Sequence, residues 1–276
     1  MKNKKKPRYT ANQLKAKLTE HIQELADATD AARVSTVMQR YLDSCAKFHR
    51  YSLNNTMLIM MAMPEATRVA GFHRWKSMGR FVKKGEKGIP ILAPIFKKVN
   101  DGDEEEGELV AFKVVYVFDI SQTAGDPLPE PPTWKSGEKD QDLSQRLRQF
   151  AQERHIQVKV EELSGDTQGV SKGGEIVLSP QAGTKIFIHE LAHEMLHQGK
   201  EKTLDKRLKE LEAESVAYVV GRHFGLRGIT SPNYVALHGA DSELILAHLG
   251  RIQETAADII CNLEENSSPE KKGAVT

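Results

Sequence analysis

Apolar residues recur at spacings of three and four along the first fifty positions, which predicts helices over 9–30 and 31–48. A shorter apolar run over 57–63 predicts a third helix, and Pro64 ends it because proline disfavours helical backbone in the residue before it. A fourth helix is predicted over 71–78, where two aromatic residues stand three positions apart. The chain is therefore expected to begin with several helices.

The pattern then changes from a helical to an extended period. Apolar and β-branched residues dominate 88–95 and 109–118, which predicts two strands. The acidic segment 100–107 lies between them and is expected to be the solvated tip of a hairpin, since it lacks the ligand order of a calcium-binding loop. Prolines cluster at 125–132 and predict an extended linker over 126–141.

The second half of the chain carries both patterns again. The expected elements are a helix over 142–154, strands over 156–163 and 174–179, helices over 186–197 and 204–220, and a long helix over 241–265. We therefore predict an α+β fold with two domains. Helices with a small β-sheet form the first, 1–125, and the second, 142–276, is a further α+β domain after the linker.

Composition is that of a globular protein. Apolar residues make up 39% and charged residues 28% of the 276 positions, and the formal net charge is +1. The apolar runs are too short to span a bilayer, and no apolar segment follows the basic N-terminus, so we expect a cytoplasmic protein with no membrane partner. The two cysteines, Cys45 and Cys261, are far apart in the sequence and predict free thiols.

A candidate metal site stands in the predicted helix over 186–197. His189 and His193 are four positions apart, so both imidazoles lie on one face of the helix and can reach one metal ion. Glu190 is turned by about 100° from His189 and is placed to act on water as a general base. This H-E-x-x-H spacing is how zinc peptidases hold Zn²⁺ and activate water. The alternative is a surface helix with solvated side chains, but the apolar neighbours favour burial, where polar groups need partners.

The next predicted helix offers a third ligand. Glu210 and Glu214 share one face, whereas Glu212 is about 200° from Glu210 and points elsewhere. Glu210 can be the third metal ligand while Glu214 orients a ligand histidine by a hydrogen bond to its other ring nitrogen, or the two roles can be reversed. The remaining alternative is that these glutamates belong to a solvated face.

Positive charge gathers in the first domain. Nine basic residues and one acid occur between Arg68 and Lys98, interleaved with aromatic residues. Cations that follow phosphates and aromatic rings that stack on bases are typical of single-stranded DNA binding. The candidate DNA-binding residues are Arg50, Tyr51, Asn54, Asn55, Arg74, Trp75, Arg80, Lys83, Lys84 and Lys87. On these residues alone, a buried Trp75 with lysines on a solvated hairpin is an equal alternative.

Two sets of motifs resemble one known family. H-E-L-A-H-E-M-L-H at 189–197 and K-E-L-E-A-E-S-V-A-Y at 209–218 resemble the metallopeptidase domain of ArdC-type antirestriction proteins and the wider ImmA/IrrE-like zincins. F-x-x-Y-S-x-N-N at 48–55 and W-x-x-x-G-R-x-V-x-K-G-E-K-G-I at 75–89 resemble the ArdC N-terminal single-stranded-DNA-binding domain over about 10–125. The resemblance implies a zincin domain in which Glu210 is the third ligand, and protection of incoming DNA from restriction.

The sequence therefore predicts a single-stranded-DNA-binding zinc metallopeptidase of antirestriction type with an unidentified protein substrate. Two alternatives stay open: a DNA-binding protector with a non-catalytic zinc site, and an ImmA-like peptidase that cleaves a repressor. Four histidines are candidates for hydrogen bonding to the transition state or for ordinary structural roles: His197, His223, His238 and His248.

Overall fold

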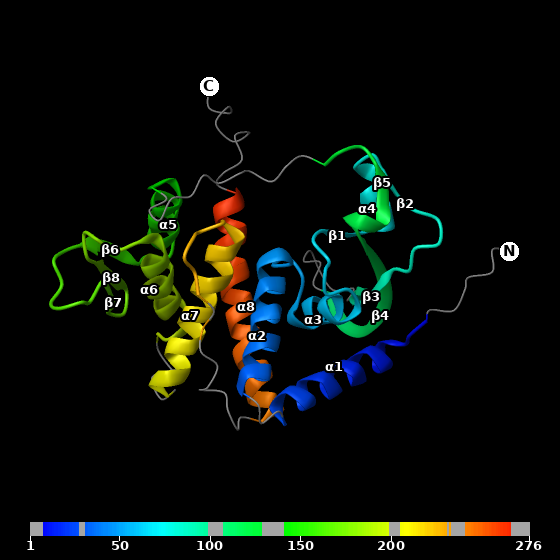
Figure 1. Ribbon diagram of the computed structural model, residues 1–276, viewed down its shortest axis with the longest axis horizontal. Helices are drawn as coiled ribbons and strands as arrows, with labels where there is room; N and C mark the ends of the chain where they lie inside the picture. Colours follow the sequence, from blue (N-terminus) through cyan, green and yellow to red (C-terminus); the bar gives the residue numbers. More distant parts are fainter. Residues whose placement is uncertain are drawn as a thin grey trace. The chain divides into compact units, whose positions relative to one another are not determined.

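The computed structural model describes residues 8–27, 31–98, 107–128, 141–198, 205–230, 232 and 241–265 of the chain (Figure 1). Its contacts divide the chain into two compact units. Unit 1 consists of residues 1–24 and 51–130, and unit 2 consists of residues 25–50 and 131–276. Each unit is described by itself.

Unit 1 is built from short helices and two antiparallel sheets. The helices are α1 (Ala11–Ala26, which enters unit 2 at its last two residues), α3 (Leu53–Ala62) and α4 (Phe72–Ser77). The three-stranded sheet has the order β1 (Val69–Gly71), β4 (Gly107–Asp119) and β3 (Ile89–Lys98), and β2 (Arg80–Val82) pairs with β5 (Thr123–Gly125). The 3₁₀ turn Ile120–Gln122 connects β4 to β5. The antiparallel pairing of β3 with β4 agrees with the predicted hairpin, whose tip at 99–106 lies outside the described residues.

The centre of unit 1 depends on two buried polar contacts. Trp75 of α4 is 1% exposed, and its indole N–H donates to the Phe118 carbonyl at 2.8 Å. Asp119 is also buried and accepts backbone N–H groups of Thr67 and Arg68. Burial opposes the charge of Asp119, but these hydrogen bonds and those from Ser121 outweigh it and lower its pKa. The end of β4 is thereby tied to the segment before β1 and to α4.

In the described part of unit 2, five helices pack with a small sheet (Figure 1). The helices are α2 (Ala31–Lys47), α5 (Gln141–Glu153), α6 (Thr184–Leu196), α7 (Lys206–His223) and α8 (Ser242–Glu265). The sheet has the order β6 (Gln157–Val160), β8 (Glu175–Leu178) and β7 (Gly169–Ser171), with β6 parallel and β7 antiparallel to β8. Helix α7 contacts α2, α6 and α8, and its residues 215–221 are all buried.

Helix α2 belongs to unit 2 although it precedes the strands of unit 1 in the sequence. The Tyr41 hydroxyl donates to Gln253 of α8 at 2.8 Å, and the Tyr218 hydroxyl of α7 donates to Asp43 at 2.8 Å. The predicted first domain, 1–125, includes this helix, so any fragment ending there separates α2 from its contacts in α7 and α8. Most of the predicted linker lies outside the described residues, at 129–140.

The α+β fold predicted from the sequence is confirmed, with helices and strands at the predicted places. Four strands of three residues each were not predicted: β1, β2, β5 and β7. Three residues are too few to show an alternating pattern. Within the described ranges, each helix is too short or too polar to cross a lipid bilayer.

Trp75→Ala is expected to destabilise the protein by about 3–5 kcal/mol, because it leaves a cavity and an unpaired Phe118 carbonyl. Chemical denaturation followed by far-ultraviolet circular dichroism measures this change. Phe81→Ala is the matched control: this ring is 59% exposed in the same unit, so its loss should change stability by less than about 0.5 kcal/mol. Equal effects of the two substitutions would contradict the core position of Trp75.

Candidate metal centre

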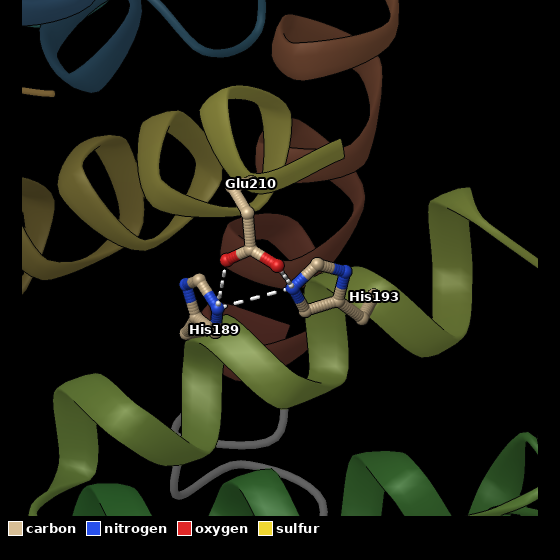
Figure 2. A group of neighbouring side chains, drawn as sticks. All are labelled: His189, His193 and Glu210. Carbon is tan, nitrogen blue, oxygen red and sulfur yellow. Dashed lines mark hydrogen bonds and ion pairs between the residues drawn. The ribbon is translucent and has the colours of Figure 1, made fainter. Parts of the chain in front are cut away.

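Two histidines of α6 aim their rings at the same point (Figure 2). Helix α6 begins at Thr184, and its apolar side chains Phe187, Ile188 and Leu191 are buried. His189 and His193 therefore occupy the remaining face, one turn apart, with their Nε2 atoms 3.0 Å from each other. Both rings are mostly buried, with exposed fractions of 12% and 15%.

Glu210 of α7 faces the two rings from the opposite side (Figure 2). Its Oε2 lies 3.5 Å from His189 Nε2, and its Oε1 lies 3.7 Å from His193 Nε2. Zn–N and Zn–O bonds of about 2.0–2.1 Å at tetrahedral angles place ligand atoms roughly 3.3 Å apart, so the three side chains fit a tetrahedral metal site. Their ligand atoms all lie within 4.8 Å of one another, as a shared ion requires. His189, His193 and Glu210 form the candidate metal centre.

The charges of the centre are coupled. Hydrogen bonds from His189 and then His193 hold the pKa of Glu210 well below its usual range. Burial lowers the pKa of His189, but the hydrogen bond with Glu210 and the charge of Glu214 outweigh it and raise the pKa. A proton on the His189 nitrogen that faces Glu210 would compete with a metal ion for that nitrogen.

Glu214 lies on the other side of the His189 ring. Its Oε1 is 3.4 Å from His189 Nδ1, and its Oε2 is 3.0 Å from Lys185 Nζ. Glu210 therefore faces the nitrogen of His189 that points into the candidate metal centre, and Glu214 faces the opposite one. Between the two arrangements that the sequence leaves open, this geometry favours Glu210 as ligand and Glu214 as the residue that orients the ring.

Glu190 is buried next to the candidate metal centre and packs against Gly169 of strand β7. It is 8% exposed, and a Cβ added to Gly169 would lie 2.7 Å from Glu190 Cγ. Burial raises the pKa of Glu190, whereas the charges of the neighbouring histidines and a backbone hydrogen bond from Ser171 oppose the rise. A carboxylate with a raised pKa beside a metal site is suited to take up and release a proton.

Glu194 has a structural role that the sequence did not reveal. Its Oε1 accepts the Ser171 hydroxyl at 2.6 Å and the Gly173 N–H at 2.9 Å, and its Oε2 accepts the Gly174 N–H at 2.6 Å. The turn between β7 and β8 is thereby fixed to α6. The paired glycines before a predicted strand are the one signal in the sequence for such a turn.

Three of the four candidate transition-state histidines have partners within unit 2. His197 contacts His193 and Glu212, and His248 also contacts Glu212. His223 contacts the Ala46 carbonyl and Glu264. His238 lies outside the described residues. These contacts favour ordinary structural roles for His197, His223 and His248 over hydrogen bonding to a transition state.

Several of the predicted DNA-binding residues have structural contacts instead. Trp75 is in the core, so its ring is not available for stacking on a base, and that assignment is corrected. Arg80 directs its guanidinium at Thr123 and at the Gly125 and Asp126 carbonyls, which hold β5 next to β2. The Asn55 amide donates to and accepts from the Leu92 backbone. In these hydrogen bonds the side chains of Asn55 and Arg80 serve as partners for backbone groups of the same chain.

The other predicted DNA-binding residues differ in how accessible they are. The Tyr51 hydroxyl donates to the Val69 carbonyl, and Arg50 pairs with Glu264 at 2.9 Å. Six are exposed: Arg50, Asn54, Arg74, Lys83, Lys84 and Lys87. Phe81, two residues before Lys83, is 59% exposed, and Phe72 is 50% exposed. These two rings were not selected from the sequence, although the R-F-V-K-K order puts an aromatic residue among cations.

Comparison with known proteins identifies the N-terminal part. Residues 10–118 match the family model for the N-terminal domain of anti-restriction factor ArdC, so this part of the chain is an ArdC-type domain. The predicted resemblance to ArdC-type proteins is thus confirmed, while the resemblance of the second half to ImmA/IrrE-like peptidases stays a prediction.

Longer alignments extend beyond this domain. An uncharacterized protein of Bacillus anthracis, pXO2-81, is 26% identical over 323 aligned positions, which cover 94% of this chain and 55% of that protein. The chain thus spans about half the length of this curated relative. Two crystal structures of the antirestriction ArdC protein from plasmid R388 are also similar. The metal-free one has 18% identity, a TM-score of 0.47 and coverage of 78% of this chain and 86% of that one. The Mn(II)-bound one has 17% identity, a TM-score of 0.45 and coverage of 83% and 99%.

Glu210→Ala and Glu214→Ala should affect metal binding to different degrees. Loss of a ligand should weaken metal affinity by more than 100-fold, and loss of a residue that orients a ligand by about 10- to 100-fold. Competition with a chromophoric chelator measures both dissociation constants in the full chain. A larger loss for Glu214→Ala than for Glu210→Ala would reverse the two roles.

Gly169→Ala should destabilise unit 2 by about 1–3 kcal/mol, because the added carbon forces β7 away from Glu190 and Ile186. Metal affinity should stay within about threefold of wild type, since no ligand of the candidate centre is touched. Denaturant unfolding and metal titration on one preparation measure the two quantities. Gly71→Ala is the control, because a carbon added there meets no atom within 4 Å.

Proposed function

We propose that this chain, whose N-terminal domain is of ArdC type, binds single-stranded DNA and hydrolyses a peptide bond at a zinc centre. The observation that carries the peptidase proposal is the convergence of His189, His193 and Glu210 beside the buried Glu190. Two histidines and a glutamate are a known catalytic zinc set, which leaves a fourth position for water or substrate. The half-exposed side chain of Glu210, at 49%, supports access to that position from solvent.

In the proposed reaction, the metal ion and Glu190 would have different roles. A zinc ion held by His189, His193 and Glu210 would act as a Lewis acid that polarises the peptide carbonyl and makes water more acidic. The Glu190 carboxylate accepts the proton of the attacking water and then delivers it to the nitrogen of the leaving amine. Burial raises the pKa of Glu190, which favours its taking up the proton in the first step. The hydrogen bond from the Ser171 backbone keeps the carboxylate oriented.

The DNA-binding proposal rests on the ArdC-type domain and on its surface. Lys83, Lys84 and Lys87 are exposed and lie within six residues of the exposed Phe81 in the sequence, which supports binding of one DNA strand by cations and an aromatic ring. Unpaired bases expose the faces that such a ring can stack on, whereas a duplex hides them. The resemblance to antirestriction proteins supports protection of incoming DNA as the purpose of this binding.

Glu190→Gln is the test of the peptidase proposal. The substitution keeps the shape of the side chain but removes its ability to accept a proton, so zinc content and DNA binding should be unchanged while hydrolysis falls at least 100-fold. A mixed peptide library incubated with the zinc-loaded full chain, with and without single-stranded DNA, is analysed by mass spectrometry. Metal-dependent cleavage that survives Glu190→Gln would remove Glu190 from the mechanism. Complete absence of cleavage by zinc-loaded wild type would leave a DNA-binding protein with a non-catalytic metal site.

Phe81→Ala is the test of the DNA proposal. It should weaken single-strand binding by about 1–3 kcal/mol, the usual contribution of one stacked base. Lys83→Ala and Lys84→Ala should each reduce the slope of log affinity against log salt by about 0.7. Fluorescence anisotropy with the full chain at several salt concentrations measures both. Val160→Ala and Lys206→Ala, exposed changes in unit 2, are the controls and should have no effect. Equal affinity of wild type for single strands and duplex would argue against stacking.

A further inference from the structure

The metal-facing histidine His193 is connected to a buried carboxylate through a second histidine. His193 Nδ1, the nitrogen that points away from the candidate metal centre, lies 2.9 Å from His197 Nδ1. His197 Nε2 lies 2.8 Å from Glu212 Oε2. The connection therefore runs from α6 to α7 in two hydrogen bonds, on the side opposite Glu210.

Glu212 is the most deeply buried acidic side chain of this region, with no exposed surface. Its Oε1 lies 2.6 Å from His248 Nδ1 and 3.2 Å from Arg251 Nε, both on α8. Burial raises the pKa of Glu212, but the hydrogen bonds from His197 and His248 and the charge of Arg251 outweigh it and lower the pKa to about 2. A buried carboxylate without such partners would be very costly, so α6 and α8 are both fixed to this group.

The direction of each hydrogen bond follows from the chemistry of imidazole. A neutral ring has one N–H and one lone pair. If the lone pair of His193 Nε2 faces a metal ion, its proton is on Nδ1 and must be donated to His197 Nδ1. His197 then carries its own proton on Nε2 and donates it to Glu212, which as a carboxylate can only accept. A single arrangement of protons therefore satisfies every group from the metal ligand to the carboxylate.

We propose that His197 and Glu212 are positioning residues of the metal centre, which fix the ring orientation and the metal-binding tautomer of His193. This inference rests on the proposed zinc centre and adds a role for residues behind it. It also assigns a separate role to each glutamate of the E-L-E-A-E segment at 210–214. Glu210 faces the metal, Glu214 faces His189, and Glu212 reaches His193 through His197 on the opposite face of α7.

Zinc affinity of the full chain is the first test, measured by competition with a chromophoric chelator. His197→Ala and Glu212→Gln should each weaken zinc binding by about 10- to 100-fold, as losses behind a metal ligand do. His223→Ala is the matched control: it removes a half-buried histidine of unit 2 that pairs with Glu264, and should leave zinc affinity unchanged. Zinc affinity within twofold of wild type for a folded His197→Ala protein would overturn the inference. Absence of zinc binding by wild type itself would instead overturn the proposed function, and this inference with it.

The second test needs no substitution, so it holds even if the variants fail to fold. Nitrogen-15 and proton correlation spectra of the zinc-loaded wild-type chain report which nitrogen of each histidine carries the proton. We expect the proton of His193 on Nδ1 and that of His197 on Nε2. A His197 ring protonated on Nδ1 would contradict the inference, because two N–H groups would then face each other between His197 and His193. A role in packing alone does not select either tautomer.

Discussion

The close packing of α6 against α7 is the interaction on which unit 2 depends. Ala192 on α6 and Ala213 and Ala217 on α7 are fully buried, and side chains this small allow two helices to approach closely. The approach puts His189 and His193 within 3.7 Å of Glu210, and it also encloses Glu190 and Glu212. Carboxylates and imidazoles buried between these helices are costly unless each has a hydrogen-bond partner. The apolar packing that buries them is therefore stable only together with the hydrogen bonds among them.

The sequence predicted those parts of the site that depend on one helix or on two consecutive ones. The spacing of His189 and His193 defines a shared face, and the helical angle between Glu210 and Glu212 separated the glutamate that faces these two histidines from the one that points toward His197 instead. The contacts of Glu194 with the turn at 173–174, and of Glu212 with α8, could not be predicted. They join segments whose relative position is set by tertiary packing, and β7 is too short to have a recognisable pattern.

Unit 1 shows where the sequence left two interpretations open. Trp75 and Arg80 were named as candidate DNA-binding residues, with a buried Trp75 as the alternative, because a tryptophan or an arginine can pack inside a protein as readily as it can bind a ligand. Trp75 and Arg80 give their N–H groups to backbone carbonyls and so hold unit 1 together. Phe81 and the lysines after it are left on the surface. Periodicity does not separate the two groups, because α4 and β2 are six and three residues long.

The proposed function requires that α6 and α7 hold one divalent ion, in a chain that shares an ArdC-type domain with known antirestriction proteins. Metal analysis of the purified full chain, wild type beside His189→Ala, tests this directly. After loading with zinc and removal of the excess, we predict one zinc ion per wild-type chain and less than a tenth of that in His189→Ala, with both proteins folded. Equal zinc content in the two proteins would contradict the metal centre.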